Sequence, residues 1–159
     1  MFLHLTNAGI MGLFNFFKKP LRINDEFFGP LRYIEIKGAR GYFEGKGLFA
    51  PLGYETEYLI EAETSGPAEW QKEFYKNLQL EFDGYIEKIK PLITDELREE
   101  DPDIEIGDFK DEFTLVNITI PFSHTPVVRW NMAFTTIHEA DHYVTVEFSG
   151  DEPVEAVLE

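Results

Sequence analysis

Apolar and polar residues alternate along the chain after Asp25, and this alternation predicts strands. The stretch LRYIEIKG places Ile34 and Ile36 on one side, and TEYLIEAE alternates Tyr58 and Ile60 with glutamates. A period of two residues is typical of a strand with one buried and one wet face. YFEGKGLFA lies between these two stretches, and glycine-containing turns separate all three. We expect three strands joined as an antiparallel meander.

From Ser65 onward the apolar spacing changes to that of a helix. Ser65-Gly66-Pro67 supplies a capping hydroxyl and a proline near the first turn, which is typical of a helix start. Pro91 is expected to kink or end this helix, and a second short helix is expected to follow as far as Leu97. The acidic stretch REEDPDIEIGD then predicts a loop. The residues expected on the buried stripe of the first helix are Trp70, Phe74, Leu78, Phe82, Tyr85, Ile86 and Ile89.

Strand alternation returns in the last third of the chain. FTLVNITIPF, VVRWNMAFTTI and YVTVEF each alternate, and the tail PVEAVLE is a candidate fourth strand. The order predicts an α+β fold, in which an antiparallel sheet of about six strands has its helices packed on one face. The sheet is expected to contain three strands, then a helical segment, then three or four strands. We expect residues 25–159 to form a single α+β domain and residues 1–24 to form an apolar N-terminal extension.

The apolar N-terminal stretch MFLHLTNAGIMGLFNFF lacks the basic start and the cleavage site of an export signal. It is also too short and too polar for a stable membrane span. Its Leu13, Phe14, Phe16 and Phe17, followed by two lysines, could lie on a membrane surface or pack on the body of the protein, and packing is favoured because the overall charge opposes anionic lipid. The sequence leaves open whether Met1 or Met11 is the true start and whether Leu158-Glu159 is native.

Charge is distributed unevenly, and this changes the functional picture. The 159 residues carry a formal charge of −16, and residues 61–112 contribute 6 basic and 17 acidic side chains to it. Such a field repels nucleic-acid phosphates and anionic lipid, and it attracts basic partners at long range. The chain has no cysteine, which excludes disulfides and cysteine chemistry and fits a reducing, cytoplasmic compartment. No cofactor is expected, and the oligomeric state is left open.

The letters HEADH, from His138 to His142, spell the zinc-protease pattern H-E-x-x-H. That pattern binds zinc when both histidines lie on one face of a helix, with the glutamate beside the metal-bound water. Here residues 130–134 and 144–148 alternate with a period of two on either side, which predicts a β-hairpin instead. His138, Glu139 and His142 are therefore weak candidates for a metal site, and no metal is expected.

Five stretches of the chain together resemble a group of small acidic bacterial domains of unknown function. They are DEFFGPLRYIE, YFEGKGLF, SGPAEWQKEFYKNL, FTLVNITI and ADHYVTVEF, and the resemblance covers residues 25–155. Similar domains occur among candidate immunity proteins of polymorphic toxins. The resemblance implies a protein that binds and covers a partner, and it supplies no catalytic residues.

Three functional hypotheses follow from the sequence. The first is a non-enzymatic acidic binding protein, of the immunity type, that occludes a basic protein partner and does not bind nucleic acid. The second is a small metal-dependent hydrolase that uses His138, Glu139 and His142. The third is an acidic mimic of DNA. The partner-binding residues expected under the first hypothesis are Glu96, Glu99, Glu100, Asp101 and Asp103.

Overall fold

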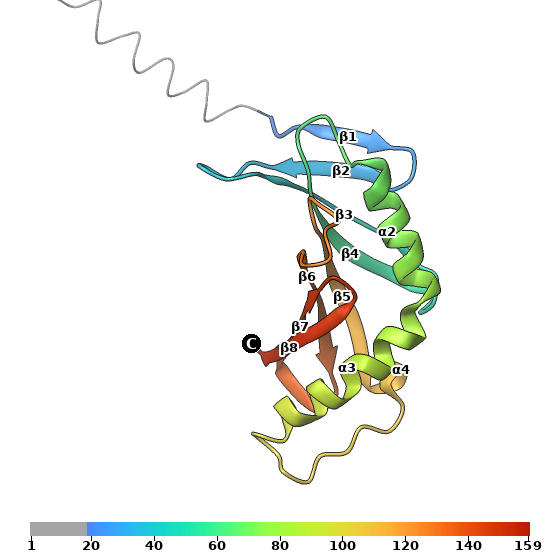
Figure 1. The fold of residues 1–159 in the computed structure, drawn as a ribbon, viewed down its shortest axis with the longest axis vertical. Helices are drawn as coiled ribbons and strands as arrows, with labels where there is room; N and C mark the ends of the chain where they lie inside the picture. The colour runs from blue at the N-terminus through green and yellow to red at the C-terminus, as the bar shows by residue number, and fades with distance from the viewer. Residues whose placement is uncertain (1–18) are drawn as a thin grey trace, which may run out of the picture.

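The computed structural model describes residues 19–159. In it, eight strands form one sheet in the order β1 to β8, and three helices accompany the sheet (Figure 1). The expected packing of residues 13–17 lies outside the described residues. The strands are β1 (Arg22–Asp25), β2 (Gly29–Ile34), β3 (Tyr42–Phe49), β4 (Tyr54–Glu61), β5 (Phe113–Ile120), β6 (Arg129–Thr136), β7 (Glu139–Ser149) and β8 (Glu152–Leu158). The helices are α2 (Glu69–Leu80), α3 (Phe82–Leu97) and α4 (Phe109–Glu112).

The α+β class is confirmed, but the expected antiparallel sheet of about six strands is corrected to a mixed sheet of eight. β4 and β5 pair in parallel, because the three helices carry the chain from the end of β4 back to the start of β5. The six other neighbouring pairs are antiparallel. The sequence pattern did not predict β1, because its four residues include only one apolar side chain, Ile23. It pairs with residues 29–32.

The arrangement of the helices also differs from the expectation. α2 and α3 follow one another over one face along the length of the sheet, while α4 is a single turn that leads into β5 (Figure 1). Pro91 neither ends nor divides a helix, because it lies inside α3; the division falls at Glu81 instead. In residues 19–159 no helix has both the length and the apolar character needed to cross a membrane.

α2 begins without the predicted serine cap. Its N-cap is Ala68, which has no side-chain acceptor, and the helix proper starts at Glu69. The Gln71 side-chain oxygen accepts a hydrogen bond from the Ala68 N–H at 2.8 Å. The Gln71 amide nitrogen donates to the backbone oxygens of Glu61 at 2.8 Å and Pro121 at 2.9 Å. One buried side chain therefore joins the start of α2 to the ends of β4 and β5.

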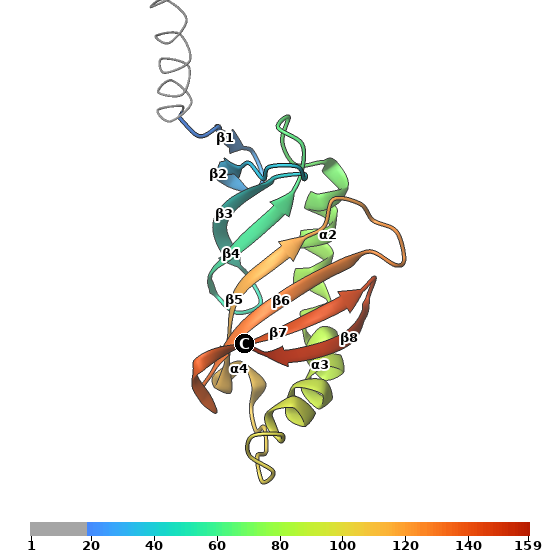
Figure 2. The same ribbon diagram turned by 90° about the vertical axis from the view of Figure 1, so that its left-hand side faces the viewer.

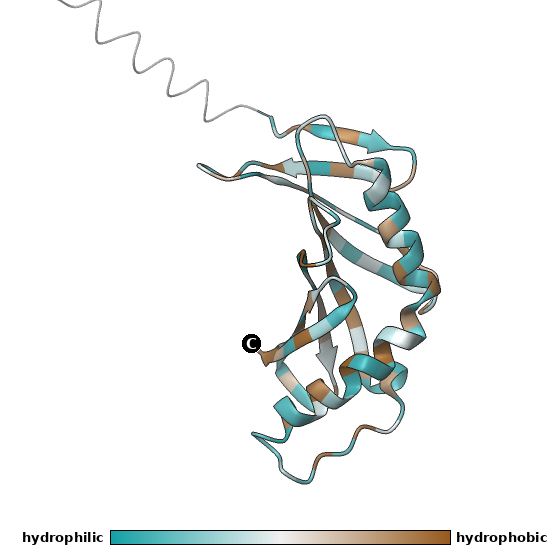
Figure 3. Cartoon of the chain, viewed as in Figure 1, coloured by the Kyte–Doolittle hydropathy of each residue, from teal (hydrophilic) through white to brown (hydrophobic). Residues whose placement is uncertain are grey.

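The core lies between the helices and one face of the sheet. The predicted helical stripe is buried at Leu78, Phe82, Ile86 and Ile89, and it continues to Ile93 and Leu97. Along the strands, hydrophobic and polar residues alternate visibly (Figure 3). The sheet contributes its inward residues, among them Phe43, Phe49, Tyr58, Ile60, Leu115, Ile118, Trp130, Met132, Phe134, Val144, Val146 and Phe148.

None of the helices of residues 19–159 lies on the opposite face of the sheet (Figure 2). The strand register places one row of residues across its middle, of which three are polar; the row runs through Glu57, Asn117, Ala133, Thr145 and Val157. These residues alternate with buried neighbours along their strands, so their side chains stand on this face. We refer to this surface as the open face.

Candidate functional site

The HEADH segment forms a β-hairpin, as its flanks predict, and not a helix. Ile137 and His138 make the turn, and Glu139 to His142 belong to β7. Thr136 pairs with Glu139 while Phe134 pairs with Val144, so the intervening residues of β7 bulge out of the ladder. Because of this bulged hairpin, the two histidines do not lie one helical turn apart on the same face, as a zinc-binding helix requires.

The two histidines face different carboxylates. The His138 Nε2 lies 2.9 Å from Oε1 of Glu112 at the end of α4, and both side chains are largely buried. The His142 Nδ1 lies 3.0 Å from Oε1 of Glu139 on the hairpin surface, and this hydrogen bond lowers the pKa of the Glu139 carboxyl. Among residues 19–159 no three histidine, aspartate or glutamate side chains are arranged to hold a metal ion. His138 instead ties the hairpin tip to α4.

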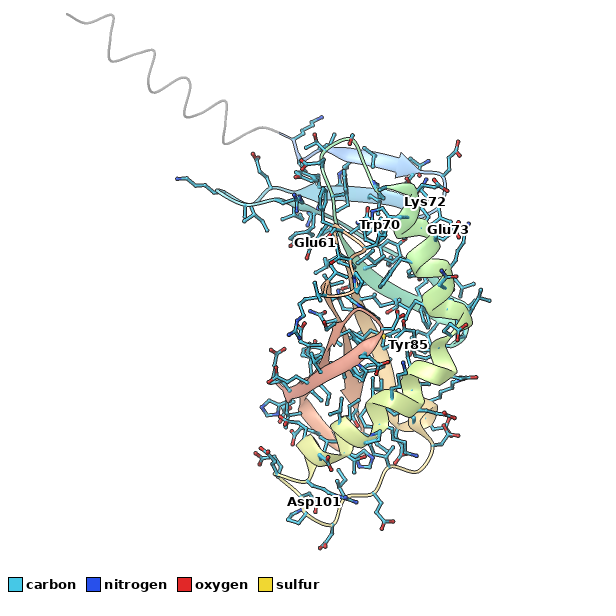
Figure 4. All side chains as sticks on the ribbon, in the orientation of Figure 1. Glu61, Trp70, Lys72, Glu73, Tyr85 and Asp101 are labelled. Carbon is cyan, nitrogen blue, oxygen red and sulfur yellow. The ribbon has the colours of Figure 1, made fainter. Side chains whose placement is uncertain are left out.

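The predicted acidic residues lie at the end of α3 and in the loop that follows it. Figure 4 shows Asp101 at the extreme end of the molecule, far from β1. Glu96 serves a structural purpose, because its Oε1 accepts a hydrogen bond at 2.9 Å from the backbone N–H of Leu158 in β8. Glu99, Glu100, Asp101 and Asp103 take part in none of the ion pairs found in residues 19–159.

The fold brings the acidic end of α3 and the HEADH hairpin to the same place. A recess of about 240 Å³ opens between them, and no lysine or arginine among residues 19–159 lines it. We call it the acidic recess; its lining residues are Glu96, Glu99, Glu100, Glu139, His142 and Leu158. The sequence predicted the acidic residues 96–100 and the HEADH residues as separate candidate sites. It did not predict that they lie together, since Glu100 and Glu139 are far apart along the chain. Asp101 and Asp103 lie outside the recess lining, on the adjoining loop.

Charge is also polarised along the whole molecule. Residues 95–112, at the end that holds the acidic recess, carry ten acidic and two basic side chains, a net charge of −8. Residues 19–49, which contain β1, β2 and β3 at the other end, carry six basic and four acidic side chains, a net charge of +2 (Figure 1). A charge separation of this kind orients an approaching charged partner before contact.

No protein-family model matches the chain, and neither do the curated proteins or the solved structures that were compared with it. The resemblance to immunity-type domains therefore stays a prediction.

Proposed function

We propose that the chain is a non-enzymatic acidic binding protein, of the immunity type, that docks a basic protein partner at its acidic end. The acidic recess carries this proposal. Four carboxylates and one imidazole line it, from the end of α3, the turn that follows α3 and the start of β7, and no lysine or arginine of the described residues does. A lysine or arginine side chain of a partner would supply the missing opposite charge.

The chemistry of the recess favours a cationic group over other ligands. An ionised carboxylate accepts hydrogen bonds but cannot donate them, whereas a lysine side chain has three donors and an arginine side chain has five. The hydrogen bond from His142 lowers the pKa of Glu139, which favours the charged form of that carboxyl. The recess is small, about 240 Å³, so it suits a single side chain inserted from a larger interface.

The surrounding charge supports the same partner. Asp101 and Asp103 lie beside the recess on the loop after α3, and both are exposed. Together with the net charge of −8 over residues 95–112 they create a field that speeds the approach of a basic surface. Mobile ions screen such a field beyond about 10 Å at 0.1 M salt, so binding is expected to weaken as salt rises.

Charge-neutralising variants of the full chain test the proposal. The double variant Glu99→Gln/Glu100→Gln is expected to lower the affinity for a basic partner, recovered from the source cell, by about tenfold or more. The control is Glu26→Gln/Glu35→Gln, because both glutamates are exposed at the opposite end of the molecule and change the net charge equally. Affinities are measured by isothermal calorimetry at two salt concentrations.

Equal losses for the two double variants would contradict the proposal, because they would show a response to net charge and not to the acidic recess. Affinity that does not change with salt would contradict it as well. Recovery of only acidic or uncharged partners would have the same consequence.

A further inference from the structure

The parallel junction between β4 and β5 is split at one end. Pairing joins residues 57–60 of β4 to residues 117–120 of β5, and the first residues of the two strands do not pair with each other. Two side chains of β4 replace the missing ladder. The Leu115 N–H donates to the Tyr54 hydroxyl at 2.8 Å, and the Thr56 hydroxyl donates to the Leu115 oxygen at 3.1 Å.

A register shift in β5 adds to this split. Leu115 pairs with Phe134 and Asn117 pairs with Ala133, so Val116 is an extra residue in the strand. A bulge of this kind bends a strand and re-aims its side chains, and such bulges are frequent beside binding sites. Here the bulge lies next to the split between β4 and β5.

A groove of about 650 Å³ lies over this split. Its volume falls within the range of roughly 300–1,000 Å³ that is usual for ligand clefts. The short side chains of Asn117, Ala133 and Thr145 lie next to one another in the strand register and line it. Tyr54 and Tyr143 stand among the other lining residues. We call this hollow the open-face groove.

The residues that line the groove are more acidic than basic. Three glutamates line it. Lys46 is the one basic lining residue in the part of the chain that the structure describes, and its Nζ is already 3.8 Å from the carboxylate of Glu55. The Glu159 side chain accepts a hydrogen bond from Thr145 at 2.9 Å. Glu57 takes part in no ion pair within residues 19–159, although it lies beside Asn117 in the floor. The group that fits is therefore a cation with several donors.

We propose that the open-face groove holds an extended, arginine-bearing segment of the basic protein partner, and that Glu57 pairs with the arginine. The inference rests on the proposed function, because it assumes a basic protein partner. An extended segment fits because the groove crosses neighbouring strands above short side chains. Arginine fits because its planar guanidinium pairs with a carboxylate through two parallel hydrogen bonds and stacks on aromatic rings such as those of the tyrosines here.

Nuclear magnetic resonance on the ¹⁵N-labelled full chain tests this assignment. The probe is a short capped peptide of alternating alanine and arginine, and the control peptide carries uncharged citrulline in place of arginine. The arginine peptide is expected to shift the amide signals of Asn117, Ala133 and Thr145 in a saturable way. Glu57→Gln is expected to weaken this binding by about tenfold. Glu155→Gln, an equal charge change on the open face outside the groove, is expected to leave it within about twofold.

A second variant tests the groove itself. Ala133→Phe places an aromatic ring over the floor without a change of charge, and it is expected to abolish the saturable shifts while the fold stays intact. Equal effects of Glu57→Gln and Glu155→Gln would overturn the assignment, as would equal binding of the citrulline peptide. Shifts confined to residues 96–103 and 139–142 would overturn it too. If Glu99→Gln/Glu100→Gln weakens the natural partner and Ala133→Phe does not, this inference fails and the proposed function stands.

Discussion

Gln71 is expected to be one of the most sensitive polar positions in the chain. Its side chain is 1% exposed, and it makes three hydrogen bonds, each to a backbone group. Two of those groups lie at the ends of β4 and β5, and the third is at the start of α2. The variant Gln71→Ala removes all three hydrogen bonds at once and leaves the three backbone groups without their partner.

The size of the effect follows from those three contacts. Each intramolecular hydrogen bond contributes about 1 kcal/mol net, so Gln71→Ala is expected to lower the free energy of unfolding by about 3 kcal/mol. Domains are stable by about 5–15 kcal/mol in total, so this loss is large. With a urea slope of about 2 kcal/mol per molar, the unfolding midpoint should fall by about 1.5 M. Tryptophan fluorescence can follow the transition.

Gln79 in the same helix provides a matched control. Its side-chain oxygen accepts one hydrogen bond, from the Ala50 N–H at 2.9 Å, in an exposed setting. Gln79→Ala is expected to lower the free energy of unfolding by about 1 kcal/mol or less. A loss at Gln71→Ala no larger than the loss at Gln79→Ala would refute the reasoning.

Gln71→Glu tests the direction of the two donated bonds. The new carboxyl keeps the shape of the amide but places an oxygen against the carbonyl oxygens of Glu61 and Pro121. Burial and those two oxygens disfavour the charged form, so the pKa of this carboxyl should be raised in the folded state. A raised folded pKa means that the carboxyl favours folding at acid pH and opposes it as pH rises. Gln71→Glu should therefore be less stable than Gln71→Ala at pH 7, and the difference should shrink near pH 4. A difference that does not change with pH would contradict this argument.

Three further predictions concern other parts of the fold. Gly84→Ala should raise the free energy of unfolding by about 0.5–1 kcal/mol, because a Cβ at this position in α3 meets nothing within 4 Å. Gly150→Ala should lower the free energy of unfolding, because φ is +58° there and the new Cβ would lie 2.5 Å from the carbonyl oxygen of Pro126. Equal urea midpoints for the two variants would contradict both expectations. Burial, and then a nearby aspartate, raises the pKa of Tyr58 to about 12, so the stability it provides is complete below pH 10 and is lost between pH 10 and 12. The free energy of unfolding should therefore fall less steeply between pH 10 and 12 in Tyr58→Phe than in the wild type, and identical pH profiles of the two proteins would count against this expectation. His138→Ala should lower the free energy of unfolding by about 1–3 kcal/mol, because it leaves the largely buried Glu112 without its partner; thermal melts that coincide with the wild type would exclude this role.

Local periodicity predicted those elements whose faces differ strongly in polarity. The buried stripe of α3 through Phe82, Ile86 and Ile89 is visible in the sequence, because residues three and four apart share one face of a helix. The β6–β7 hairpin is equally visible, since Trp130 and Phe148 begin and end two alternating runs that pair with each other. In both cases the pattern depends on burial of one face, and burial is what the structure shows.

Other features depend on contacts between distant parts of the chain, which no local pattern contains. Nothing in the alternation of β4 or β5 indicates that the two strands are parallel neighbours. The predicted serine cap is absent because α2 begins only at Glu69, with Ala68 as its N-cap, and the Gln71 side chain accepts a hydrogen bond from the Ala68 N–H there. The acidic recess joins Glu99 to His142, and the sequence separates these residues by more than forty positions. Candidate residues were therefore predictable, while their grouping was not.

The parallel junction between β4 and β5 also has a consequence for the order in which the sheet is completed. β1 to β4 form one series of hairpins and β5 to β8 form another, and each can assemble from neighbouring segments within a short time. Glu57 and Asn117, which meet at the junction, lie sixty residues apart. Joining them closes a long loop and loses the most chain entropy before any contact compensates for it. The rate of folding is thus expected to depend on the helices that connect the two halves more than on any single hairpin.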